Sequence, residues 1–255
     1  MKRLLVLAAL MTAAVVFKSS PGQAANSVKI STKGDQLCIS SNGTPNHTIG
    51  TFPNRGNPHR FRAQKLTYCV DATPRDTGRV THRTNASGIS LTGIPFRPGT
   101  ADFYDASSPR GFSRDASSGW RLEGMGAADM LGMDRQNAHV DHRGLYHYHA
   151  PAPALTASLK GTLIGYAADG FPIHYVGNSV KASWQLKPGK RPTAPNGRYD
   201  GTYEQDWQHV SGSGNLDECN GAIVDGSYVY FATDSFPFFP RCFRGTVSRD
   251  FLGRP

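Results

Sequence analysis

Two histidines and two tyrosines alternate in the stretch GLYHYHAP, residues 144–151. Successive side chains of a β-strand point to opposite faces, so a strand here carries His147 and His149 on one face and Tyr146 and Tyr148 on the other. The strand rise places the two imidazoles roughly 7 Å apart, a spacing from which both can bind one metal ion. The pattern therefore predicts either a chelating face or the ordinary polar face of a half-buried strand.

The segment NAHVDHRG, directly before this strand, supplies a third histidine. If residues 142–144 form a three-residue hairpin loop that ends in a left-handed glycine, His139 lies opposite His147. Directly opposed residues project from the same face with Cβ atoms roughly 5 Å apart. One hairpin then presents His139, His147 and His149 together, with Asp141 nearby. A four-residue loop would instead turn His139 toward the tyrosines.

Three neutral imidazoles with an open fourth position suit copper or zinc. We therefore predict a transition-metal site at His139, His147 and His149, and assign His142, at the loop tip, to solvent. Because neutral imidazole is the binding form, the affinity should fall as the pH drops towards about 5. The alternative is a polar hairpin whose histidines bond to backbone groups or tyrosine hydroxyls.

Four more residues are candidates for an additional ligand or a supporting hydrogen-bond partner: His47, Asp141, Asp169 and Glu218. His47 lies in a loop, where an exposed turn histidine is the default. Asp169 precedes a Gly-Phe-Pro turn, and its carboxylate is expected to cap that turn rather than to bind metal. Glu218, beside Cys219, could approach the histidine face as a ligand or as an acceptor for a ligand imidazole.

Motifs of other catalytic chemistries are absent from the sequence. It has no G-x-S-x-G nucleophile turn, no H-E-x-x-H helix and no phosphate-binding glycine loop. An enzyme built on this chain would therefore depend on a metal ion. No residue is assigned a catalytic role at this point.

The first 24 residues have the pattern of a secretory signal peptide. Lys2 and Arg3 precede the apolar run LLVLAALMTAAVVF, and small residues lead to a cleavage position after Ala24. The apolar run is too short to anchor the chain in a bilayer, and no later segment is long enough to cross one. We therefore expect a soluble periplasmic or secreted protein, whose mature part is residues 25–255, with no transmembrane anchor.

The positive charge of the chain is scattered. Removal of Lys2, Arg3 and Lys18 with the signal peptide lowers the formal net charge from +9 to +6. Stretches such as RFRAQK and KPGKRP are separated by acidic residues, whereas a nucleic-acid-binding surface clusters its basic residues. We therefore expect no nucleic-acid partner.

The four cysteines of an exported chain indicate disulfides, for which three connectivities exist. None forms a C-x-x-C pair. The cysteines form two pairs in the sequence: Cys38 and Cys69 are 31 residues apart, and Cys219 and Cys242 are 23 residues apart. This spacing favours the disulfides Cys38–Cys69 and Cys219–Cys242. Each bond would close a local loop and constrain the unfolded chain by roughly 3 kcal/mol. The crossed pairings remain open.

The 28 glycines and 17 prolines disfavour long helices. Seven short β-branched or aromatic segments bounded by turn residues read as strands: SVKIST, QLCISS, KLTYCV, GISLTG, GLYHYHA, TLIGYAA and SYVYFAT. We predict one mainly β domain, an antiparallel sandwich or distorted barrel, with long loops at 104–119 and 185–201 and little helix, except a short one near 124–133. Tyr228 and Tyr230 alternate like the hairpin tyrosines, which suggests a shared aromatic core.

Four sequence blocks resemble the YHYH-domain family of exported bacterial proteins: LGMDRQNAHVDHRGLYHYH, LIGYAADGFPIHY, YDGTYEQDWQHVSGSGNLDECNG and YVYFATDSFPFFPRCFRG. The earlier segments SNGTPNH and GIPFRPGTADFYD are similar to its first motifs, so the resemblance runs from about residue 37 to 245. The family is named for its motif and has no established reaction. The resemblance implies a single YHYH-type domain after the signal peptide and a metal-binding histidine motif.

This chain departs from the family pattern at two places. His174 stands where the family usually has tyrosine, so it is a poor candidate for a shared ligand. Asp141 and His142 replace a polar residue followed by proline, which leaves the type of the hairpin turn open.

Three functions follow from the sequence. The first is an exported metal-binding protein with a histidine-rich hairpin. The second is a metal-dependent hydrolase or oxidoreductase on the same site, which a cleft beside the hairpin and acidic supporting groups would favour. The third is a disulfide-stabilised interaction module with a protein or glycan partner at the cell surface, which a filled, flat hairpin face would favour.

Overall fold

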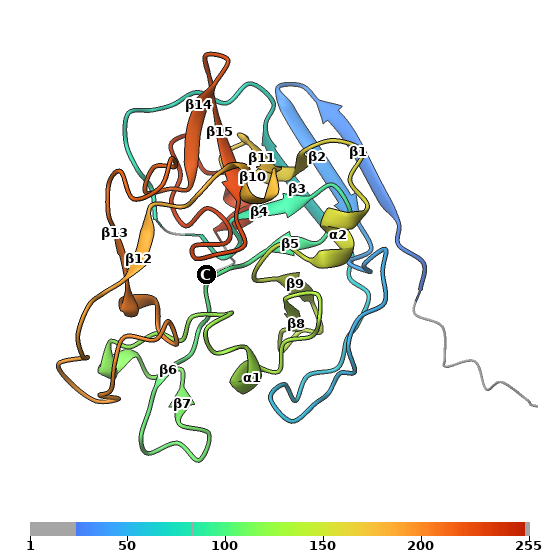
Figure 1. Ribbon diagram of the computed structural model, residues 1–255. Helices are drawn as coiled ribbons and strands as arrows, with labels where there is room; N and C mark the ends of the chain where they lie inside the picture. Colours follow the sequence, from blue (N-terminus) through green and yellow to red (C-terminus); the bar gives the residue numbers. More distant parts are fainter. Residues whose placement is uncertain (1–23, 83, 253–255) are drawn as a thin grey trace, which may run out of the picture.

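The computed structural model describes residues 24–82 and 84–252 (Figure 1). Apart from Ala24, the predicted signal peptide lies outside the described residues. Within the described part, no helix combines the length and apolarity needed to cross a membrane.

Strands are the main regular structure of the described residues, and the helices are short, as the glycine and proline content predicts. The strands are β1 (Val28–Lys33), β2 (Gln36–Ser41), β3 (Leu66–Asp71), β4 (Gly88–Ser90), β5 (Pro95–Phe96), β6 (Phe103–Tyr104), β7 (Phe112–Ser113), β8 (Ala138–Val140), β9 (Tyr146–Tyr148), β10 (Leu163–Ala167), β11 (Pro172–Tyr175), β12 (Trp184–Leu186), β13 (Trp207–His209), β14 (Gly221–Val224) and β15 (Ser227–Ala232). The helices are α1 (Ala128–Leu131), α2 (Pro153–Ala157) and the 3-10 turns η1 (Ala116–Ser118), η2 (Gly177–Ser179), η3 (Glu204–Asp206) and η4 (Arg249–Phe251).

The largest sheet has the strand order β14-β15-β11-β10-β4-β5-β9-β8, and a separate sheet has the order β1-β2-β3. Ile39 on β2 and Val70 on β3 join the same core as Ile89 on β4, so the two sheets bury a common apolar layer, as in a sandwich. The described strands form no closed barrel. Most neighbours are antiparallel, as predicted, but β11 pairs with β15 and β5 with β9 in parallel.

Each of the seven predicted strand segments contains a strand, and the predicted short helix is α1. The two predicted loops are less irregular than expected. The 104–119 segment contains β7 and η1, and the 185–201 segment contains most of β12. Phe112 on β7 explains the first difference, because it is buried with Trp120 and Tyr203 in a small second core that fixes the segment.

Tyrosines from two distant hairpins share one core, as predicted. Tyr146 and Tyr148 on β9 and Tyr228 and Tyr230 on β15 all belong to the main apolar cluster. Three of their hydroxyls donate to carboxylates, Tyr146 to Asp134 at 2.7 Å, Tyr228 to Asp217 at 2.9 Å and Tyr230 to Asp169 at 2.7 Å. These bonds satisfy hydroxyl groups that burial would otherwise leave without partners.

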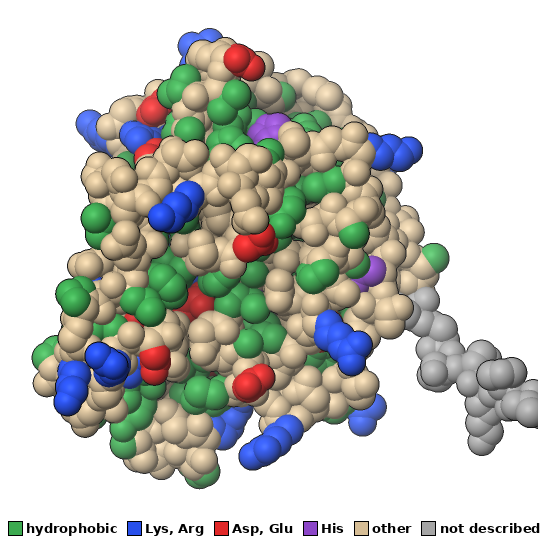
Figure 2. Space-filling view, viewed as in Figure 1, with side chains coloured by type: hydrophobic (Ala, Val, Ile, Leu, Met, Phe, Trp, Pro, Cys, Tyr) green, Lys and Arg blue, Asp and Glu red, His purple; other side chains and the backbone are tan. Residues whose placement is uncertain are grey.

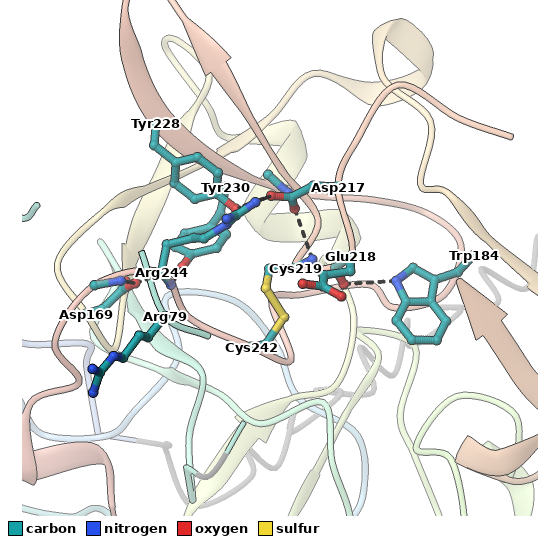
Figure 3. The surroundings of a disulfide bond; sticks show 12 residues. Arg79, Asp169, Trp184, Asp217, Glu218, Cys219, Tyr228, Tyr230, Cys242 and Arg244 are labelled. Atoms are coloured by element: carbon teal, nitrogen blue, oxygen red, sulfur yellow. Dashed lines mark hydrogen bonds and ion pairs between the residues drawn. A yellow bond between two sulfur atoms is a disulfide. The ribbon is translucent and has the colours of Figure 1, made fainter. Parts of the chain in front are cut away.

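Both disulfides follow the local pairing that the spacing favours. Cys38 on β2 and Cys69 on β3 are direct partners in the antiparallel register, with Cα atoms 4.0 Å apart. Cys219 and Cys242, with Cα atoms 4.9 Å apart, lie beside the pair of Asp217 and Arg244 (Figure 3). The first bond joins two neighbouring strands, and the second fastens the C-terminal segment to the start of β14.

On the face of the molecule that Figure 2 shows, lysine and arginine side chains are spread over the surface with acidic side chains among them. This distribution follows the scatter of charge along the sequence.

Candidate metal centre

The histidine motif forms a hairpin of β8 and β9 at one end of the large sheet (Figure 1). His139 pairs directly with His147, and the amide of Asp141 donates to the carbonyl of Leu145 at 3.0 Å. Gly144, with a φ of 89°, supplies the left-handed residue of the loop. The three-residue loop and the register predicted from the sequence are therefore confirmed.

Asp141 stabilises the turn of this hairpin. One carboxylate oxygen accepts the amides of Arg143 at 2.8 Å and Leu145 at 3.0 Å, and the other accepts the guanidinium of Arg97 at 2.8 Å. Burial opposes ionisation of Asp141, but the amide of Leu145 and the charge of Arg97 outweigh it and lower the pKa of this carboxyl. The Asp141 carboxylate therefore stabilises the loop and forms an ion pair with Arg97.

The two faces of β9 have different surroundings, as the alternation predicts. Tyr146 and Tyr148 are fully buried in the main core. The Nε2 atom of His47 lies 2.7 Å from the hydroxyl of Tyr148, so His47 belongs to the tyrosine face. The prediction that it could complete a site with the hairpin histidines finds no support in this position.

The other face brings the three predicted ligands together. One ring nitrogen from each of His139, His147 and His149 lies within 4.8 Å of the others. The Nε2 atoms of His139 and His149 are 3.2 Å apart. Tetrahedral zinc with bonds near 2.0–2.1 Å separates its nitrogen ligands by about 3.3 Å, so the spacing of His139 and His149 fits one shared ion.

Backbone carbonyls fix the orientation of all three imidazoles. The Nδ1 atom of His139 lies 2.9 Å from the carbonyl of Leu131, that of His147 lies 3.1 Å from Leu145, and that of His149 lies 3.4 Å from Pro98. A carbonyl can only accept, so each Nδ1 carries the proton and each Nε2 presents a lone pair. Such a second contact is what orients histidine ligands in metal sites.

Burial keeps these imidazoles neutral. Desolvation is the largest influence on each, and it lowers the pKa of His139 to about 4 and the pKa values of His147 and His149 well below the ordinary value of 6.5. The positive charge of Arg97 lowers all three pKa values further. The facing lone pairs of His139 and His149 therefore lack a shared proton, and a metal cation is the group that would satisfy them both.

The segment from Glu123 to Leu131 forms the wall behind the triad. The carboxylate of Glu123 accepts the amides of Met125 at 2.8 Å and Gly126 at 2.7 Å, which holds the turn leading into α1. The last residue of α1, Leu131, offers its carbonyl to His139. At Gly124 an added Cβ would lie 2.2 Å from Nδ1 of His149, so only glycine lets the imidazole stand in this position.

We predict that Gly124→Ala weakens metal binding by 10- to 100-fold, the range typical of disturbed groups behind metal ligands. The new methyl group must displace the His149 ring, whose Nδ1 atom contacts the carbonyl of Pro98, while all three histidines remain present. Titration of the metal-free variant with zinc, compared with the wild type, measures the effect. Gly161→Ala is the control, because an added Cβ there meets nothing within 4 Å. Equal affinities of Gly124→Ala and the wild type would contradict the prediction.

A pocket of about 640 Å³ opens over the histidine face of the hairpin. All three histidines contribute to its lining, together with Asp141 and the loop-tip residue His142. The side chain of His142 is exposed, as predicted. The hairpin face is thus hollow rather than filled and flat, and a bound ion there would keep a position open to small molecules.

The other two candidate residues lie elsewhere. Asp169 accepts the hydroxyl of Tyr230 at 2.7 Å and the amide of Gly245 at 2.8 Å, so it joins distant segments instead of capping only its own turn. Glu218 is exposed, and its carbonyl accepts the Trp184 indole N–H near the Cys219–Cys242 disulfide (Figure 3). Among the residues that the structure describes, neither belongs to the cluster of potential metal ligands.

Sequence reasoning missed the groups that support the triad. Three are main-chain carbonyls, those of Leu131, Leu145 and Pro98, for which no side-chain signal exists. Arg97 lies in the GIPFRPGTADFYD block that resembles the family, but the block does not reveal its contact with Asp141. The supporting groups are carbonyls, so the acidic supporting groups expected of a metalloenzyme do not contact the imidazoles.

Comparison with known proteins gives a family. A family model described as YHYH protein matches residues 67–245, which is more than half of the chain and includes the whole hairpin. Neither the curated proteins nor the solved structures contain a significant match.

Proposed function

The chain belongs to the YHYH protein family, and we propose that it is an exported protein that binds one transition metal ion through the Nε2 atoms of His139, His147 and His149. The observation that carries the proposal is the shared orientation of the three rings. Each Nδ1 proton is directed to a backbone carbonyl, so three lone pairs remain for one cation. Three neutral nitrogen ligands favour copper or zinc over the oxygen-preferring magnesium and calcium.

The donor set fits such an ion better than it fits a structural role. A structural histidine normally uses both ring nitrogens in hydrogen bonds. Among the described residues, Nε2 of His147 has no hydrogen-bond partner, and Nε2 of His139 and His149 face each other. A stabilising network would leave fewer lone pairs without donors, so we favour metal binding over the interaction module.

Two features support export. The N-terminal segment has the charge and apolar pattern of a signal peptide, with cleavage near Ala24. The two disulfides, Cys38–Cys69 and Cys219–Cys242, persist in oxidising compartments such as the periplasm or the exterior. We propose that residues 25–255 act there as a single domain.

A metal-dependent hydrolase or oxidoreductase is the second candidate. The pocket over the triad favours it, because a site that serves only to stabilise the fold is usually closed by four protein ligands. A bound ion would supply Lewis acidity at the floor of this pocket. The protein would contribute the fixed imidazoles and the space for a substrate.

We expect the untagged protein, purified from its exported fraction, to contain close to one copper or zinc ion per chain. Inductively coupled plasma mass spectrometry measures the content directly. An affinity tag rich in histidine would obscure the result, so a cleavable tag of another chemistry is needed. If the purified protein contains no metal and also fails to bind added copper, zinc or iron, the proposal is wrong and the histidines have a structural role.

A further inference from the structure

The pocket over the triad is rich in arginine. Its lining includes Arg97, Arg110, Arg114, Arg121 and Arg241, against three carboxylates, Asp102, Asp141 and Glu204. Arginine is the residue that recognises carboxylate, phosphate and sulfate groups through its fork of donors. Only the arginine charges that the carboxylates of the protein leave unpaired can bind a ligand.

Three of the arginines are engaged by carboxylates. Arg97 binds Asp141 at 2.8 Å. Arg241 bridges Glu123 at 2.5 Å and Glu204 at 2.7 Å, and Arg121 lies 3.9 Å from the same Glu204. These three arginines and three carboxylates balance one another, so they fix the pocket wall without adding net charge.

The two remaining arginines have no ion-pair partner among the described residues. Arg110 donates to the carbonyl of Gly56 at 2.9 Å and lies over the ring of Phe112, but it makes no ion pair with a described residue. Arg114 likewise has no ion-pair partner in the described part of the chain. Asp102 is the one other carboxylate of the lining, and both arginine charges act on it without contact.

The charge balance of the pocket therefore calls for an anion. Two free arginines against Asp102 leave one positive charge, and a divalent ion on three neutral histidines raises the excess to three. An external anion in the pocket would offset this excess of positive charge.

We propose that the pocket binds a small organic anion, whose carboxylate, phosphate or sulfate group is held by Arg110 and Arg114 while the rest of the molecule extends toward the triad. The volume of about 640 Å³ is that of a small-molecule site and exceeds what a single inorganic ion needs. This inference rests on the proposed metal site and names the class of ligand that shares it.

The test is calorimetric titration of the metal-loaded protein, at low ionic strength, with inorganic phosphate, sulfate and citrate in turn. Comparison of the three identifies the preferred acid group. We expect Arg110→Gln/Arg114→Gln to bind the preferred anion at least tenfold more weakly, because two charge-assisted contacts are lost. Arg135→Gln is the matched control, since Arg135 is exposed and does not line the pocket. Both substituted side chains are exposed, so the fold should persist in circular dichroism.

The metal content of each variant separates this inference from the metal proposal. The double variant should keep its metal, because neither arginine contacts a histidine. If it keeps its metal and binds the anions as tightly as the wild type, or if the wild type binds none of them, the anion site is refuted. If the wild type holds no metal, the metal proposal fails, and the same titration of the metal-free proteins decides the anion site alone. Weaker binding by the double variant then supports it, and equal binding refutes it.

Discussion

His147→Ala and His149→Ala should each lower the metal affinity by more than a hundredfold, and the triple variant His139/His147/His149→Ala should bind none. Disturbing a group behind a ligand already costs 10- to 100-fold, so removing the ligand itself must cost more. Each substitution deletes one of three imidazoles that each place a ring nitrogen within 4.8 Å of the other two. Competition of the protein with a coloured chelator for zinc or copper measures the affinity.

Three controls distinguish ligand loss from unfolding. His149→Gln keeps a polar side chain of similar size and should stay folded, but it too should lose metal. His142→Ala removes an exposed imidazole at the loop tip and should bind as the wild type does. Tyr148→Phe removes only the hydroxyl that contacts His47 at 2.7 Å, on the opposite face, and should cost about 1 kcal/mol of stability without loss of metal. Undiminished binding by the triple variant would mean that the histidines are structural.

The metal should remain bound at pH 5 and dissociate only as the pH falls toward 4. Protons compete with metal for Nε2, and a histidine of ordinary pKa begins to take them up near pH 6.5. Burial lowers the pKa of His139 to about 4 and those of His147 and His149 well below 6.5, so the competition starts at lower pH than the sequence alone suggests. Dialysis at stepped pH followed by metal analysis gives the midpoint, and release centred near pH 6 would contradict this expectation.

The same pKa shifts make the metal-free fold sensitive to acid. Below pH 6.5 the unfolded chain binds protons at these histidines while the folded chain does not, so the free energy of unfolding falls as the pH falls. The loss amounts to roughly 1.4 kcal/mol per pH unit for each such histidine, until the folded pKa is reached. Urea unfolding at pH 7, 6 and 5 should show a steeper decline for the metal-free wild type than for His147→Gln. Parallel declines would show that His147 titrates normally.

Local patterns in the sequence determined the hairpin and its histidine face. Alternation along residues 146–149 separates histidines from tyrosines because strand side chains alternate, and Gly144 sets the loop length that aligns His139 with His147. The even number of cysteines and their close spacing likewise indicated the two disulfides. These features depend on neighbours along the chain, so periodicity and turn chemistry are sufficient to find them.

Only the tertiary structure decided what surrounds the triad. His47 contacts Tyr148, and Asp169 contacts Tyr230, so both lie away from the three histidines. These contacts join segments that are distant in the sequence, and they depend on the order of the strands in the sheet. The parallel pairing of β5 with β9 aligns Phe96 with Tyr148, next to the segment that brings Pro98 to His149. A main-chain carbonyl has the same chemistry in every residue, so no sequence pattern marks the ones that orient these imidazoles. The motif thus specified the three histidines and their common face, and the packing of remote segments around it determined their burial, their neighbours and the pocket.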